Sequence, residues 1–89
     1  MKSYTSERFR KLLGDLPESV RKQAREAYQF FKDDPHHPGL QFKKVHTTRS
    51  IYLARVNVDY RVLGILDGDE IVWFWISPHT EYEKLLSRL

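Results

Sequence analysis

Residues 59–78 read DYRVLGILDGDEIVWFWISP and carry the strongest β-structure pattern in the chain. Two runs rich in β-branched and aromatic residues, 60–66 and 70–76, flank the dipeptide Asp67-Gly68. Asp-Gly readily adopts the positive φ angles of a type I′ turn, so the stretch predicts a β-hairpin with that turn. After its first residue the second run is entirely apolar, which predicts a central strand covered on both faces.

Two amphipathic helices are predicted before the hairpin, over residues 6–14 and 18–33. Apolar residues recur at intervals of three and four in both segments, and Pro17 between them suits the first turn of a new helix. The charged residues of both helices form a basic outer surface. The loop DDPHHPG, residues 33–39, ends the second helix because proline disfavours the α conformation in the residue before it.

The rest of the chain predicts strands and a final short helix. The segment before the first helix is compatible with an edge strand. Four strand-like runs lie between residues 40 and 77: 40–46, 50–58, 60–66 and 70–76. A last helix is predicted from about residue 79, with Ser77 as its cap and Pro78 in its first turn. The sequence therefore predicts an α+β fold in a single domain, residues 1–89.

Composition narrows the range of functions. There is no cysteine, so no disulfide or thiolate metal site is expected, and a reducing, cytoplasmic location is permitted. His36 and His37 are adjacent and lack a third ligand nearby, so we expect no metal and no cofactor. Neither a signal peptide nor a membrane-spanning run is evident, and we expect no membrane partner.

Positive charge is concentrated in the first half of the chain. Residues 1–49 contain 11 Lys and Arg against 6 Asp and Glu, whereas residues 50–89 contain 4 against 6. A basic half favours a polyanion or an acidic protein as partner. The alternative is that these charges only solvate the helix surface.

Several strand residues have side chains suited to a phosphodiester. Successive side chains of a strand point to opposite faces of the sheet. Arg55 therefore shares a face with Ile51 and Leu53, and Arg61 shares a face with Leu63. Burying an unpaired arginine is costly, so both should face water or an anion on a partly open concave sheet face. Lys43, Lys44 and His46 lie on a neighbouring strand, and His79 begins the last helix.

RNA cleavage by internal attack needs a base near the 2′-hydroxyl, cations on the phosphate and an acid for the leaving oxygen. Arg55, Arg61 and Lys43 or Lys44 can supply the charge. Proton transfer has four candidates: His79, His46, Glu81 and Tyr82. Tyr52 or Tyr82 could instead stack on a base.

Each of these residues also has a purely structural alternative. Arg61 could pair with Glu81 or Glu83, and His79 could be a simple exposed residue. Tyr82 lies on the apolar stripe of the last helix, which is typical of core packing. Lys43 and Lys44 could protect a sheet edge against aggregation, and His46 could have no chemical role.

The segment YLARVNVDYRVLG, from Tyr52 to Gly64, carries a resemblance that extends over nearly the whole chain. Together with LPESVRKQAREAYQFFKDDPHHPGLQFKKV and VWFWISPHTEYEKLL, it resembles the RelE/ParE superfamily of bacterial type II toxins. The resemblance implies a helical hairpin packed on a small, mainly antiparallel, twisted sheet with a C-terminal helix. It also implies a partner, an acidic and partly disordered antitoxin.

The resemblance leaves three functions open. RelE-like toxins are ribosome-dependent endoribonucleases that cut mRNA, which implicates His79, Arg61 and Tyr82 in catalysis. The resemblance also assigns RNA binding to Lys43 or Lys44. From the strand pattern we add His46 and Arg55 as further RNA-binding candidates. ParE-like toxins instead inhibit DNA gyrase without catalysis. The third possibility is a degenerate member that only binds its antitoxin.

Overall fold

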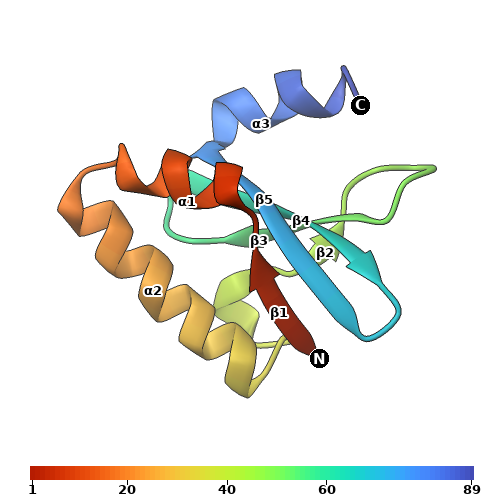
Figure 1. Ribbon diagram of the computed structural model, residues 1–89, viewed down its shortest axis with the longest axis horizontal. Coiled ribbons are helices and arrows are strands. Elements are labelled where there is room, and N and C mark those ends of the chain that lie inside the picture. Colours follow the sequence, from red (N-terminus) through yellow and green to blue (C-terminus); the bar gives the residue numbers. More distant parts are fainter.

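The computed structural model describes residues 1–89, which form three helices, one 3₁₀ turn and five strands (Figure 1). In chain order these are β1 (Lys2–Thr5), α1 (Glu7–Gly14), α2 (Glu18–Asp33), η1 (Pro38–Leu40), β2 (Lys43–Lys44), β3 (Ile51–Arg55), β4 (Tyr60–Asp67), β5 (Glu70–Pro78) and α3 (His79–Leu86). The predicted helices and the four strands between residues 40 and 77 are confirmed. No helix is both long enough and apolar enough to cross a membrane.

The strands form one sheet in the order β1-β5-β4-β3-β2. β1 pairs with β5 in parallel, and every other pair is antiparallel. The predicted α+β fold class and the N-terminal edge strand are therefore confirmed. β2 is much shorter than the predicted 40–46 run, because η1 occupies Pro38–Leu40 and Gln41 adopts a left-handed conformation with φ of 49°.

α1 and α2 cover one face of the sheet, and the residues buried there form the helix-side core (Figure 1). Its buried members are Phe9, Ala24, Phe31, Leu40, Ala54, Val62, Ile71, Trp73 and Ile76. Ser6 begins α1 by accepting a hydrogen bond from the Phe9 backbone N–H at 3.1 Å. Phe31 contacts the Trp73 indole edge to face, with ring centroids 5.2 Å apart. Phe31 thereby packs α2 against β5, and Phe9 brings α1 into the same core.

The opposite face has a smaller core, which we call the α3-side core. Its buried members, Ile51, Leu53 and Leu63, pack against the half-buried side chains of Tyr82, Leu85 and Leu86. From β5, Phe74 and Trp75 pack against this core and Val72 stays exposed, so the prediction that β5 is covered on both faces holds only in part. This face is only partly open, as predicted, because α3 covers some of it.

A bulge in β5 lets the strand pack on both faces. Leu63 pairs with Trp75 and Gly64 with Trp73, so Phe74 has no partner on β4. The extra residue changes the alternation, and Trp73 and Ile76 both face the helix-side core. Without the bulge these two side chains would lie on opposite faces.

Two local predictions are wrong. Asp67 pairs with Glu70, so the turn residues are Gly68 and Asp69. Only Gly68 has a positive φ, of 60°, which fits a type II′ turn with glycine first and excludes type I′. Ser77 does not cap α3, because Pro78 occupies the cap position and the buried Ser77 hydroxyl accepts a hydrogen bond from the Trp75 indole at 2.9 Å.

Gly64 is required where the Trp73 ring crosses β4. A Cβ atom at this position would lie 2.7 Å from Trp73 Cε3 and 2.9 Å from Ile71 Cγ1. We predict that Gly64→Ala lowers the free energy of unfolding by about 1–3 kcal/mol, the usual cost of overpacking a core. Urea unfolding would measure the change.

Gly14→Ala is the matched control. A Cβ there would meet nothing within 4 Å, and the residue ends α1 at a helical position. Its unfolding free energy should stay unchanged or rise by up to about 1 kcal/mol. Equal effects of the two substitutions would contradict the packing explanation.

Candidate functional site: a cationic cluster at the end of the sheet

Arg55, Arg61 and Ser77 form a row across three strands at one end of the sheet. Arg55 pairs with Arg61 on β3 and β4, and Arg61 pairs with Ser77 on β5. The turn Asn57–Asp59 connects β3 to β4 next to this row. The two predicted arginines are therefore brought together by strand register.

The Asn57 carbonyl oxygen orients both guanidinium groups. It accepts a hydrogen bond from Arg55 Nε at 3.2 Å and another from Arg61 Nη1 at 2.6 Å. Arg61 Nη1 also contacts the carbonyl oxygens of Val58 at 3.3 Å and Tyr60 at 3.0 Å. The other donors of both guanidinium groups make no hydrogen bond within the chain. Two like charges this close repel each other, so an anion between their free donors is favoured.

His79 lies at the same turn. Its backbone N–H donates to the Asp59 carbonyl oxygen at 2.7 Å, which fixes the start of α3 beside the arginines. The residue is exposed, and its ring has no hydrogen-bond partner. An imidazole can both accept and donate a proton, so the site combines cations with a free proton carrier.

No carboxylate neutralises this cluster. The only ion pairs in the chain join the N-terminal amine to Asp69 and Lys11 to Glu7. The structural alternative for Arg61, pairing with Glu81 or Glu83, is therefore wrong. Both arginines keep their charge available for an external anion.

Tyr82 has a packing role and also lies near the site. It is three residues after His79, so the two side chains share one side of α3. Its ring packs against the α3-side core, as the structural alternative predicted. Its hydroxyl makes no hydrogen bond within the chain.

Lys43 and Lys44 point to opposite faces of the sheet. Lys43 lies opposite Leu53 of the α3-side core, whereas Lys44 lies opposite Tyr52, which packs on the helix-side core. Directly opposed residues share a face, so only Lys43 shares the face of Arg61. Either lysine was expected to supply charge to the site, and strand register leaves Lys43 as the one on the face of Arg61.

His46 lies far from the cluster and has a local role. Its Nδ1 accepts hydrogen bonds from the Arg49 backbone N–H at 3.0 Å and from Thr48 at 3.3 Å, which closes a loop. Val45 next to it bonds to Ile51, so His46 lies at the opposite end of β3 from Arg55, roughly 13 Å along the strand. The structure does not bring His46 to the site.

Asn57 orients the arginines of the cluster. The sequence patterns did not identify it as a site residue. Its side-chain oxygen accepts hydrogen bonds from the backbone N–H groups of Asp59 and Tyr60, each at 2.8 Å, and its amide donates to Gln23 of α2 at 2.6 Å. An Asn at the start of a turn is a recognised signal for such an arrangement. No group of three or more His, Cys, Asp or Glu side chains is placed to hold a metal ion.

A helical hairpin on a mainly antiparallel sheet, completed by a C-terminal helix, is the fold of known toxins. The structure matches a chain of the RelB–RelE antitoxin–toxin complex from Methanococcus jannaschii with a TM-score of 0.70 and 18% identity, over 92% of this chain and 96% of that chain. It matches YafQ from E. coli with a TM-score of 0.72 and 9% identity, over 91% and 96%. At such identities the likeness concerns the fold.

The family is established by sequence. The ParE-like toxin domain matches residues 18–84, and the chain belongs to this family. The predicted membership of the RelE/ParE superfamily is thereby confirmed, and the protein is a type II toxin. The archaeal RelE–RelB complex from Pyrococcus horikoshii OT3 is a further match, with a TM-score of 0.68 and 21% identity over 86% of this chain and 92% of that chain. A search of curated proteins found no match.

Asn57→Ala tests whether the turn depends on this side chain. The substitution removes the acceptor for two backbone N–H groups and the bond to Gln23. We predict a loss of about 1–3 kcal/mol in unfolding free energy, since each net hydrogen bond contributes about 1 kcal/mol. Val58→Ala, at a neighbouring residue that is 65% exposed, should change the stability by less than about 0.5 kcal/mol. Similar urea midpoints for Asn57→Ala and wild type would contradict the proposed role of Asn57.

Proposed function

We propose that this toxin is a ribosome-dependent mRNA endoribonuclease that inhibits translation in the cytoplasm. The observation that carries the proposal is the shared Asn57 carbonyl, which holds two guanidinium groups with free donors beside the unpaired His79 ring. Binding an anion and moving a proton are the two tasks that phosphodiester cleavage requires.

In this mechanism Arg61 and Arg55 bind the non-bridging oxygens of the scissile phosphate. The 2′-oxygen attacks phosphorus and loses its proton, and the bond from phosphorus to the 5′-oxygen breaks. The products are a 2′,3′-cyclic phosphate and a 5′-hydroxyl, so one proton is removed and one is supplied. His79 carries one of these protons, and Tyr82 is the nearest candidate for the other. Lys43 extends the positive charge on the same face toward the sheet edge.

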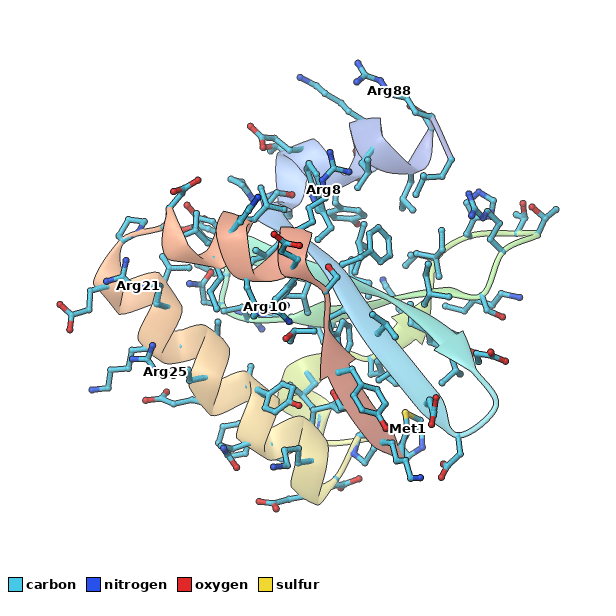
Figure 2. All side chains as sticks on the ribbon, in the orientation of Figure 1. Met1, Arg8, Arg10, Arg21, Arg25 and Arg88 are labelled. Carbon is cyan, nitrogen blue, oxygen red and sulfur yellow. The ribbon has the colours of Figure 1, made fainter.

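The proposed protein partner is an acidic antitoxin. A groove of about 420 Å³ lies between α1 and α2, with Phe9, Leu13 and Ala24 in its apolar lining and Arg10 and Arg25 also bordering it. Figure 2 shows these guanidinium groups together with Arg21 on the helical hairpin. An amphipathic segment with carboxylates would match both the apolar and the charged groups. Two of the similar structures, from Methanococcus jannaschii and Mycobacterium tuberculosis, are described as complexes of a toxin with its antitoxin.

Gyrase inhibition is the second candidate function. It is favoured by the ParE-like family match and by the presence of a single free imidazole at the cluster. In that case Arg55 and Arg61 would be binding contacts, and no proton carrier would be needed.

Substitution of His79 separates the two functions. His79→Gln keeps hydrogen bonding but removes the titratable group, so we predict that mRNA cleavage on programmed ribosomes falls by roughly 100- to 10,000-fold. Arg61→Lys should also reduce cleavage, because an ammonium cannot reproduce the planar guanidinium fork.

His36→Gln is the matched control, because His36 is an exposed histidine in the loop after α2 and should leave cleavage unchanged. Unimpaired cleavage by His79→Gln would remove this residue from the mechanism. Wild-type protein that cuts no mRNA but traps gyrase on DNA would replace the ribonuclease with the gyrase inhibitor.

A further inference from the structure

Phe30 is an aromatic side chain that the core does not use. It is 49% exposed, although its neighbour Phe31 is 2% exposed and central to the helix-side core. Its ring stacks on the His37 ring, with centroids 4.8 Å apart and an angle of 22° between the planes. The two rings cover each other's inner faces, and a flat aromatic face of the exposed pair remains on its outer side.

This aromatic pair borders a cleft of about 200 Å³ between α2 and the loop that leads into η1. Ala27, Leu40 and Val56 contribute apolar lining, and the polar residues are Gln23, Glu26 and Arg55 together with His37. Ligand pockets for drug-sized molecules measure roughly 300–1,000 Å³, so a single planar group fits this smaller cleft better.

The polar groups of the cleft retain capacity for a ligand. His37 Nδ1 accepts the Gly39 backbone N–H at 3.1 Å, which leaves its Nε2 unused within the chain. Glu26 has no ion pair, and its carboxylate can accept hydrogen bonds. A flat apolar surface beside free donors and acceptors matches a nucleobase, which stacks on its face and bonds at its edge.

Arg55 connects this cleft to the cationic cluster. It lines the cleft and also shares the Asn57 carbonyl oxygen with Arg61. β2 pairs only with Leu53 and Tyr52, so at Arg55 the strand is at the open edge of the sheet. A phosphate bound by Arg55 and Arg61 would therefore be adjacent to a base in the cleft.

We propose that the cleft binds the base of the nucleotide next to the scissile phosphate, which deepens the ribonuclease proposal and rests on it. Phe30 and His37 provide the stacking surface, and Glu26 accepts hydrogen bonds from the base edge. Guanine presents two adjacent N–H donors to a carboxylate, whereas uracil presents only one. The cleft therefore selects guanine.

Glycine-selective ¹⁵N labelling tests this directly, because the chain has four glycines and only Gly39 lines the cleft. We expect added guanosine 5′-monophosphate to move the Gly39 signal saturably and to bind at least about fivefold more tightly than uridine 5′-monophosphate. The signals of Gly14, Gly64 and Gly68 should stay in place and report that the fold is intact.

Two variants assign the roles within the cleft. Phe30→Leu keeps an apolar contact with the loop but removes the aromatic face, and it should weaken guanosine monophosphate binding about fivefold or more. Glu26→Gln should remove the preference for guanine over uracil. Tyr4→Leu is the matched control, because Tyr4 is a 45% exposed aromatic residue on β1 and should have no effect.

A Gly39 signal that does not respond to guanosine monophosphate, or unchanged affinity in Phe30→Leu, would overturn the proposal. Equal binding of both nucleotides would overturn the selection by Glu26. The titration contains no ribosome and measures no cleavage. A protein that binds the nucleotide but cuts no mRNA would thus disprove the ribonuclease alone, and one that cuts mRNA without a Gly39 response would disprove the cleft alone.

Discussion

The turn at Asn57 is the constraint on which both the β3–β4 hairpin and the candidate site depend. Its side chain satisfies the N–H groups of Asp59 and Tyr60, which would otherwise lack partners in the turn. The Asn57 carbonyl oxygen accepts hydrogen bonds from Arg55 and Arg61. In the same turn, the Asp59 carbonyl oxygen accepts the His79 backbone N–H and so holds the start of α3. Three strands and a helix therefore meet at one short loop, and the charged groups meet there with them.

This end of the sheet is supported by packing of β5 on the helix side and by partial coverage on the other face. The bulge at Phe74 directs Trp73 and Ile76 into the helix-side core, while α3 packs on the other face. α3 covers only part of that face, since Ile65 and Val72, a cross-strand pair, stay 42% and 39% exposed. The cationic cluster lies at the start of α3, where the helix leaves the sheet and the arginine side chains remain accessible.

Apolar periodicity made most of the helices and strands predictable from the sequence. The features that could not be predicted depend on the register in which the strands pair. Apolar periodicity is a property of each segment alone, so α2 and β5 were predictable without knowing their neighbours. The site at Arg61 was predictable because a charged residue in an apolar strand must reach water or an anion. The face of Lys44 depends on which residue of β3 it pairs with, and the bulge at Phe74 has no signal in a run that is apolar from Ile71 to Ile76. His46 was misassigned because its loop-closing hydrogen bonds appear only in three dimensions.

We infer that Arg55 and Arg61 act as one anion-binding unit. A double-mutant cycle with Arg55→Ala and Arg61→Ala tests it most directly, with affinity measured for a short oligonucleotide in which a 2′-deoxy substitution prevents cleavage. If both groups hold one phosphate beside the Asn57 carbonyl, the two effects should be non-additive by about 1 kcal/mol or more, as for residues in one contact network. Effects that add within about 0.5 kcal/mol would mean that the two arginines bind independently and do not share one phosphate.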